Sequence, residues 1–434
     1  MKKVLIVSYY FPPMGMSGVQ RTLKFAKYLP HYGWQPHVLT VSSPRYFAFD
    51  TSLLAELPRD TPIHRTGSWD ALSLMQSLGR RRTAIRTGES MDPPERVRES
   101  LSLLSQTLFQ PDNKIGWLPF ALRKGLRLLA AEPFDLIYST APPYTDHLVG
   151  LALKALCKLP LVVDFRDAWT QNPRHTYVTP FHLGMNQLLE RLVIRQADAV
   201  VSINEWIQDG LRRARAWERD PKFGVVSHGF DPDDFRFDDG EPTPSSDVFT
   251  ITYTGTFYGA ITPRYFLQGL RLLLDEMPEA RRKIRAVFVG VFRKDNQRLV
   301  QELRLEDVVE IVPYSEHRQS VGYLLRSHLL WLTIAEGPTI STSKLYEYIG
   351  ARKPILACVP PDGAAARVVR DLGNGTVVPP QDVRAIKEAL RAYYHRFTTS
   401  GLPLTDARKV RRYDRKTLTG RLAEVFDAAL ASRG

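Results

Sequence analysis

The amino-acid sequence predicts an α/β protein made of two doubly wound domains. The chain has 434 residues, which exceeds the size at which a single hydrophobic core usually stops growing. Short β-branched apolar runs alternate with helix-length segments, as in a parallel sheet that helices cover on both faces. A stretch rich in Asp, Pro, Ser and Gly interrupts this alternation, which then starts again in the second half.

The first domain is predicted over residues 1–230. An apolar run at 4–8 is the first expected strand, and a helix from about 18 to 32 follows it. From about residue 59 to 114 the strand rhythm fails, and we expect an irregular basic insertion there. The remaining strands of this domain are predicted at 36–41, 136–139, 161–164 and 199–203.

A linker is predicted at 231–248, and the second domain is expected to cover residues 249–404. Its strands are predicted at 250–254, 286–290, 308–312, 329–334 and 354–358. Residues 405–434 contain an apolar stripe at helical spacing. We expect this terminal helix to pack back on the first domain.

Composition and charge narrow the possible functions. The net charge of +13 implies attraction to something anionic, which could be nucleotide phosphates, acidic lipid headgroups or a nucleic acid. No aromatic RNA-binding signature, zinc module or recognition-helix pattern supports the nucleic acid. The N-terminal apolar run is too short for a signal peptide, and no apolar stretch is clean enough to span a bilayer. We therefore expect a cytoplasmic protein, peripheral at the inner face of the plasma membrane.

Two places in the sequence could bind phosphate, because a helix that starts after a strand offers free amide groups and a positive dipole end. The first is the glycine-containing turn 15–18, with Arg21 one turn into the helix. The second is the turn 340–344, whose helix also carries Glu347. Each place could instead be an ordinary tight turn, and Lys344 with Glu347 could be a solvent-exposed helical pair.

Five motifs in order resemble the retaining glycosyltransferases of family 4, which have the GT-B fold. They are SYYFPPMGMSGVQR from residue 8, VVDFRDAWT from 162, SHGFDPDDF from 227, YTGTFYG from 253 and TSKLYEYIGARKPIL from 342. IGWLPFALRKG at 115–125 and STAPPYTDHL at 139–148 are similar to the branch found in exopolysaccharide assembly. The resemblance implies two Rossmann-like domains facing a cleft, with the donor bound by the second and the acceptor by the first.

The resemblance also implies the residues of a donor site. Glu347 would bind the two ribose hydroxyls, the turn 340–344 would bind the diphosphate through its amides, and the Gly255 loop would lie under the phosphates. Arg264 and Lys344 would supply positive charge. A second acidic residue that the family often has is replaced here by Thr339, so the donor sugar stays open. The full expected set is Gly255, Thr256, Arg264, Ser341, Thr342, Ser343, Lys344 and Glu347.

On the acceptor side, the resemblance implies that Gly18 allows phosphate and acceptor to approach the first helix. Arg166 and Asp167 fall where the family has a pair facing the transferred sugar. His147 could be an acceptor-side base or simply a packed histidine. No metal or cofactor is expected, since amides, a helix end and a cation can stabilise the leaving phosphate. Asp231-Pro232-Asp233 spells D-x-D, but we interpret it as a turn.

The predicted function is transfer of a hexosyl unit from a UDP- or GDP-sugar to a lipid-linked or glycan acceptor, with retention of configuration, in cell-surface polysaccharide biosynthesis. An anionic membrane surface is an expected partner, through basic residues that include Arg80, Arg81, Arg82 and Arg86. A solvated charged loop is the alternative for that cluster. The alternatives for the whole protein are a GT-B epimerase or phosphorylase, or a non-catalytic nucleic-acid-binding protein.

Overall fold

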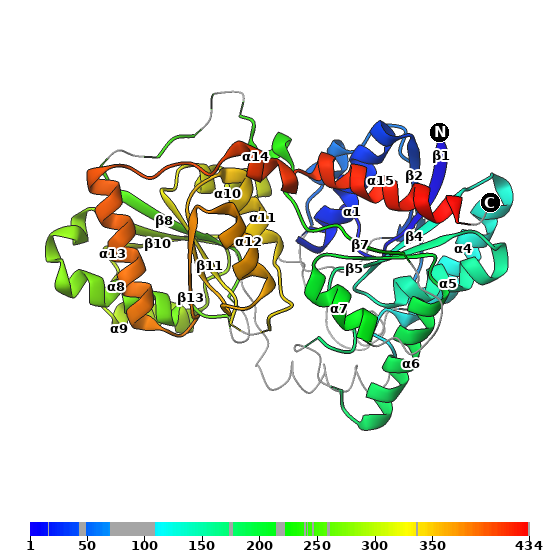
Figure 1. Ribbon diagram of the computed structural model, residues 1–434, viewed down its shortest axis with the longest axis horizontal. Coiled ribbons are helices and arrows are strands. Elements are labelled where there is room, and N and C mark those ends of the chain that lie inside the picture. Colours follow the sequence, from blue (N-terminus) through cyan, green and yellow to red (C-terminus); the bar gives the residue numbers. More distant parts are fainter. Residues whose placement is uncertain are drawn as a thin grey trace. The chain divides into compact units, whose positions relative to one another are not determined.

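The protein consists of two α/β units, each built on its own parallel sheet (Figure 1). Unit 1 is Met1–Ser227 together with Arg415–Gly434, and unit 2 is His228–Asp414. The predicted fold class, two Rossmann-like domains, is confirmed. The computed structural model describes residues 1–15, 17–42, 49–69, 109–172, 177–213, 222–237, 240, 242–244, 247–257, 261–335 and 337–432.

Unit 1 contains a seven-stranded sheet in the order β3-β2-β1-β4-β5-β6-β7, and every neighbouring pair is parallel. Parallel strands buried on both faces need near-continuous apolar runs, and those of β1, β4 and β5 are accordingly buried. The strands are β1 (Lys2–Val7), β2 (Trp34–Val41), β3 (Ile63–Thr66), β4 (Leu136–Ala141), β5 (Leu161–Phe165), β6 (Ala199–Ser202) and β7 (Lys222–Val225).

Helices cover both faces of this sheet. The helices α1 and α15 lie side by side, and α4 and α5 pack together (Figure 1). The helices of unit 1 are α1 (Ser17–Tyr28), η1 (Leu29–Tyr32), η2 (Ser52–Glu56), η3 (Ile115–Trp117), α4 (Leu118–Ala131), α5 (Thr145–Cys157), α6 (Pro180–Gln196), α7 (Glu205–Arg213) and α15 (Arg415–Ala431).

Part of the predicted irregular insertion is regular structure, which corrects the sequence interpretation. Residues 63–66 form β3, which pairs with β2 at the edge of the sheet. The strand reads Ile-His-Arg-Thr and is only partly buried, so it lacks the apolar run that marks the central strands. The arginines at 80–82 and 86 lie outside the described residues, and their predicted role stays a prediction.

Unit 2 has a six-stranded sheet in the order β10-β9-β8-β11-β12-β13. The helices α8 and α13 pack on one face, and α10, α11 and α12 cover the other (Figure 1). The strands are β8 (Phe249–Thr254), β9 (Ile284–Val289), β10 (Val309–Val312), β11 (Leu329–Thr333), β12 (Ile355–Cys358) and β13 (Gly375–Val378). The helices are α8 (Arg264–Glu276), η5 (Pro278–Arg282), α9 (Lys294–Glu302), α10 (His317–Leu325), α11 (Ser343–Ala351), α12 (Ala364–Leu372), α13 (Val383–Thr399), α14 (Ala407–Val410) and η6 (Arg411–Tyr413).

The segment predicted as a linker begins with packed structure. Residues Pro232–Phe235 form the single turn η4, in which the side chain of Asp231 accepts a hydrogen bond from the Asp233 amide at 3.1 Å. Phe230 and Phe235 form an edge-to-face ring pair, and both rings lie against Gly350 of α11. The start of the segment is therefore part of unit 2, and the D-x-D sequence forms a turn.

The C-terminal helix α15 belongs to unit 1. Its apolar stripe at Leu418, Leu422, Phe426 and Ala429 is fully buried, and α15 contacts α1. The Phe426 ring lies 5.2 Å from that of Trp34 and 5.4 Å from that of Tyr138. No helix within the described residues is both long enough and apolar enough to cross a membrane.

We predict that Phe426→Ala lowers the free energy of unfolding of unit 1 by about 3–5 kcal/mol, because truncating a buried phenylalanine removes apolar contacts and leaves a cavity. Chemical denaturation followed by circular dichroism measures the change. The control is Glu424→Ala, at an exposed position of the same helix. A Phe426→Ala variant as stable as this control would contradict the importance of α15 to unit 1.

Candidate active site

Each sheet has one point where the strand order reverses. In unit 1 this switch lies between β1 and β4, and in unit 2 between β8 and β11. Ligands of open α/β sheets bind outside the carboxyl ends of the strands at such a point, because neighbouring helices there diverge to opposite faces. Most of the predicted site residues follow β4, β5, β8 or β11, or begin the helices after β1 and β4.

At the switch point of unit 2, Lys344 lies against the end of β8. Its Nζ donates a hydrogen bond to the Tyr253 hydroxyl at 2.6 Å and lies 4.4 Å from the centre of the Tyr253 ring. Tyr253 is buried, whereas Lys344 keeps part of its surface exposed. Lys344 is in the first turn of α11. The cation and the helix N-terminus are therefore held at the strand end where the Gly255 loop begins.

The backbone of the Gly255 loop requires glycine. Gly255 has a φ of +124°, and a Cβ there would collide with the end of the Lys344 side chain. Gly290, which follows β9, has a φ of +133°, and a Cβ there would overlap the Gly255 backbone. Residues that carry a Cβ atom are strained at such φ values. The two glycines thus let the loop and the lysine approach closely, and Thr256 follows in partly exposed loop.

Two tyrosines of α11 fix the helix to its surroundings. The Tyr348 hydroxyl accepts a hydrogen bond from the Thr254 amide at 3.0 Å, and burial raises the pKa of Tyr348. The Tyr346 hydroxyl lies 2.9 Å from the Ser341 hydroxyl, and both side chains are buried. Ser341 therefore uses its side chain within the protein, and only its backbone could serve a ligand.

The side-chain hydroxyl of Thr342 is buried and has no hydrogen-bond partner among the described residues. Thr342 occupies the N-cap of α11 but makes no side-chain cap hydrogen bond. A buried hydroxyl without a partner is costly, so a ligand oxygen at this helix end would find a donor. Ser343 begins the helix, and Glu347 lies one turn after Lys344 and is partly buried.

A pocket of about 320 Å³ opens at the same edge of the sheet. Arg264 is exposed at the first position of α8, and Thr333 ends β11. Polar and apolar surface both line it, and Arg264, Thr333 and Gln381 contribute polar side chains that a hydroxylated or charged ligand could use. The lining residues are Thr262, Arg264, Tyr265, Thr333, Ala335, Pro380 and Gln381.

In unit 1 the structure brings Arg166 to Gly18. The Arg166 guanidinium donates to the backbone oxygens of Gly18, Pro142 and Ala141, and only 6% of the residue is exposed. A Cβ at Gly18 would lie 3.7 Å from the Arg166 Nη1, which is ordinary contact. Arg166 therefore connects α1 to the ends of β4 and β5, and the protein itself does not require glycine at position 18.

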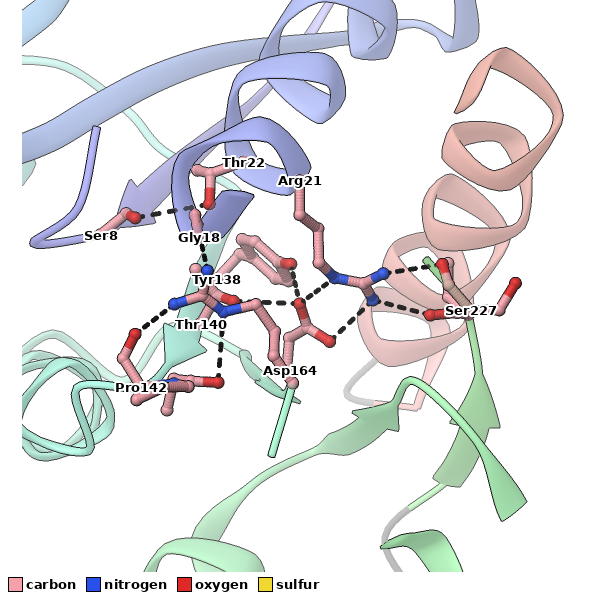
Figure 2. Close-up of polar contacts among 12 residues, drawn as sticks. Ser8, Gly18, Arg21, Thr22, Tyr138, Thr140, Pro142, Asp164 and Ser227 are labelled. Carbon is pink, nitrogen blue, oxygen red and sulfur yellow. Dashed lines mark hydrogen bonds and ion pairs between the residues drawn. The ribbon is translucent and has the colours of Figure 1, made fainter. Parts of the chain in front are cut away.

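Arg21 does not serve the candidate phosphate turn, which corrects the sequence interpretation. Its guanidinium forms a two-point ion pair with Asp164 at 2.8 and 2.9 Å (Figure 2). It also donates to the Val226 and Ser227 oxygens, both at 2.8 Å. Arg21 and Asp164 are fully buried, so the guanidinium has no surface to offer a ligand.

His147 is also fully buried. Its Nδ1 lies 2.8 Å from the Ser139 hydroxyl, and its Nε2 has no hydrogen-bond partner among the described residues. Burial lowers the pKa of His147 to about 3, with a partly opposing effect of Asp164 and a further lowering by Arg166. The imidazole is neutral at neutral pH, and an acceptor could reach it only after movement of the chain. Asp167, at the end of β5, is partly exposed.

Sequence reasoning missed several residues of this site. Tyr253 holds Lys344, Tyr348 holds the Thr254 amide, and Gly290 makes room for Gly255. Thr333 and Gln381 line the pocket with Arg264. A hydroxylated aromatic residue two positions before a loop glycine was a usable signal for Tyr253. The others depend on contacts between distant segments, which spacing along one segment does not reveal.

Two family models match the chain, one for each unit. Residues 17–222 match the glycosyl transferase 4-like domain, and residues 252–396 match the model of glycosyl transferases group 1. Each unit therefore carries one of the two matches, and each has a switch point of the kind at which ligands of open α/β sheets bind. The chain is a glycosyltransferase with the GT-B fold. No curated protein sequence matches it.

Solved structures with the same fold carry several activities. Sucrose-phosphate synthase from Thermosynechococcus elongatus is 15% identical, with a TM-score of 0.62 and full coverage of both chains. Anabaena HepE, in complex with UDP and glucose, is 16% identical with a TM-score of 0.63, over 98% of this chain and 100% of HepE. A Listeria monocytogenes protein described as a UDP-N-acetylglucosamine 2-epimerase is 12% identical with a TM-score of 0.55, over 95% and 94%. At these identities the similarity establishes the fold alone.

We predict that His147 makes unit 1 less stable in acid. The unfolded histidine takes up a proton near its ordinary pKa of 6.5, whereas the folded one does so only near 3. Between these values, falling pH favours the unfolded state by about 1.4 kcal/mol per pH unit. In the His147→Asn variant, the free energy of unfolding should therefore fall less steeply as the pH is lowered.

Chemical denaturation at pH 7, 6 and 5 measures the free energy of unfolding at each pH and hence its slope. The control is His31→Asn, at an exposed position of the same unit, which should keep the slope of the unmodified protein. Equal slopes for His147→Asn and the unmodified protein would show that His147 is protonated in the folded state.

Proposed function

We propose that the protein transfers a hexosyl unit from a nucleotide-diphospho-sugar, with UDP or GDP as carrier, to a lipid-linked or glycan acceptor. Configuration at the anomeric carbon is retained, and the reaction belongs to cell-surface polysaccharide biosynthesis on the cytoplasmic side of the membrane. The two glycosyltransferase domains support transfer as the reaction. The UDP and glucose in the HepE structure make UDP-glucose the first donor to test.

The proposal of a donor site rests on one observation. Lys344 and the N-terminus of α11 lie against the Gly255 loop. A helix N-terminus is equivalent to roughly half a positive charge, and the lysine adds a whole one. Thr342 adds a buried hydroxyl without a partner in the described chain. These groups come from segments that meet only in the folded unit, and together they suit the diphosphate of a donor. Glu347 on the same helix would then bind the ribose hydroxyls.

The proposed reaction needs no nucleophile from the protein. The bond between the anomeric carbon and the β-phosphate oxygen breaks, and the acceptor oxygen bonds to that carbon on the same face. The acceptor proton passes to an oxygen of the leaving phosphate. Lys344 and the helix end stabilise the charge that develops on this phosphate, which is the usual route to large rate gains. No bound metal or cofactor is needed in this scheme.

Glu347→Gln should weaken UDP or GDP binding by about 1.5–3 kcal/mol, or roughly ten- to a hundredfold, because an amide can accept from only one of the two ribose hydroxyls. Isothermal titration calorimetry measures the loss. The matched control is Glu302→Gln on α9, at an exposed position, which should bind the nucleotide normally. Unchanged affinity in the Glu347→Gln variant would remove Glu347 from the site.

Turnover should persist in EDTA, and Lys344→Ala should lower kcat by about a hundredfold while weakening nucleotide binding much less. The reason is that a positive charge aimed at the leaving phosphate contributes mainly in the transition state. Lys283→Ala, exposed before β9 at the opposite edge of the sheet, is the control. Loss of activity in EDTA that manganese restores would contradict the proposed scheme.

Epimerisation is the second candidate, because the Listeria protein with this fold carries that description. An epimerase would return an isomerised sugar and would not need an acceptor. A transferase releases the nucleoside diphosphate in proportion to the glycosylated acceptor. Product analysis with and without acceptor separates the two reactions.

A further inference from the structure

The outward face of α6 in unit 1 carries large apolar side chains in solvent. Phe181 is 73% exposed, Leu188 65% and Leu192 42%. At about 100° per residue, the three positions fall within about 40° of one another around the helix axis. They therefore lie along one face of the helix, which we call the α6 stripe. In Figure 1, α6 is the teal helix at the lower end of its unit.

The opposite face of α6 is already packed. Asn186, Glu190, Val193 and Ile194 are buried. Asn186 accepts a hydrogen bond from the Trp169 indole at 2.9 Å, and Glu190 accepts one from the Thr170 hydroxyl. A helix on a protein surface normally has one apolar face toward the core and polar residues outside. In α6 the inner face is packed within unit 1. The apolar side chains of the stripe on the outer face would therefore be stabilised by contact with an apolar surface outside the unit.

On α6 itself, the exposed charged residues beside the stripe are arginines. Arg191 and Arg195 are exposed, and they lie within about 60° of the edge of the stripe. Glu190 is the one acidic residue of the helix, and it faces inward. The outer face of α6 therefore combines apolar side chains with cations and presents no carboxylate. This combination fits a surface with anionic headgroups above an acyl layer.

A second copy of the chain is the other possible occupant. A stable dimer buries roughly 800 Å² on each partner, and three side chains on one helix supply only a fraction of that. An anionic lipid surface needs no such area and is complementary to the arginines of the helix.

We infer that the α6 stripe and its arginines form a membrane-docking surface for anionic lipids. Phe181, Leu188 and Leu192 enter the boundary between headgroups and acyl chains, and Arg191 and Arg195 contact lipid phosphates. The inference rests on the proposed function in one respect only, since a lipid-linked acceptor must be met at a membrane. The docking surface itself is independent of the donor site.

The test uses the full-length protein in sedimentation with two kinds of vesicle, phosphatidylcholine alone and phosphatidylcholine with phosphatidylglycerol. The unmodified protein should bind the anionic vesicles and be released by high salt. Changing Phe181, Leu188 and Leu192 together to Gln should weaken binding about tenfold or more. Arg191→Gln and Arg195→Gln should each weaken it about fivefold. All of these positions are exposed or half-exposed, so the fold should survive, as circular dichroism can verify.

Two matched leucine variants test whether the α6 stripe itself binds the vesicles. Leu188→Gln should reduce vesicle binding, whereas Leu272→Gln, at a 41% exposed position of α8, should not. Calorimetric titration with UDP or GDP should be unchanged in every α6 variant. Failure of the unmodified protein to bind either nucleotide would overturn the proposed function and leave the vesicle result standing.

Three outcomes would overturn the docking surface. The unmodified protein could fail to sediment with anionic vesicles, or the triple variant could bind as well as the unmodified protein. Light scattering could instead show a dimer that the triple variant abolishes, which would assign the stripe to a second copy. The variant with Arg80, Arg81 and Arg82 changed to Glu keeps the α6 stripe, so it tests the basic cluster separately.

Discussion

The fold of unit 1 depends on a buried ion pair between Arg21 of α1 and Asp164 of β5. Burial alone would raise the pKa of Asp164, but the charge of Arg21 and hydrogen bonds from Arg21 and Tyr138 hold it below its ordinary value. Isolated charges are very costly in an interior. Here the carboxylate also accepts from Tyr138 and Thr140, at 2.6 and 3.0 Å, and the guanidinium donates to two carbonyls after β7. The pair thus fixes the first helix, the central strands and the segment after β7 to one another.

This pair also limits what unit 1 can offer to a ligand. Arg21 and Arg166 both stand near the carboxyl ends of β4 and β5, where cations for a phosphate would be expected, but both guanidinium groups are occupied by the protein itself. Their positive charge orients backbone carbonyls and supports the start of α1. In unit 2 the opposite holds, because Lys344 is only partly buried and stands at a helix end. The stronger positive field for a diphosphate therefore belongs to unit 2.

The sequence predicted what depends on local pattern and missed what depends on distant contacts. Apolar runs gave the central strands such as β1 and β8, whereas the short edge strands β3 and β13 have no such run. The resemblance placed Gly255 and Lys344 in one site, and the structure brings them together. It could not reveal that Tyr253 holds the lysine. Arg21 was misjudged because helical spacing cannot distinguish a ligand from a carboxylate 143 residues away.

The proton of the acceptor presents the remaining chemical constraint. His147 has a pKa near 3 and is closed off from solvent, so it could accept a proton at neutral pH only weakly and only after the chain opened. Arg166 donates and cannot accept. Asp167 is the partly exposed member of this group, and a carboxylate there can orient a sugar hydroxyl. In the reaction that we propose, the leaving phosphate supplies the base, because its negative charge grows as the bond to the sugar breaks. In that scheme the acceptor attacks on the face from which the phosphate leaves, and this is the retention of configuration that we propose.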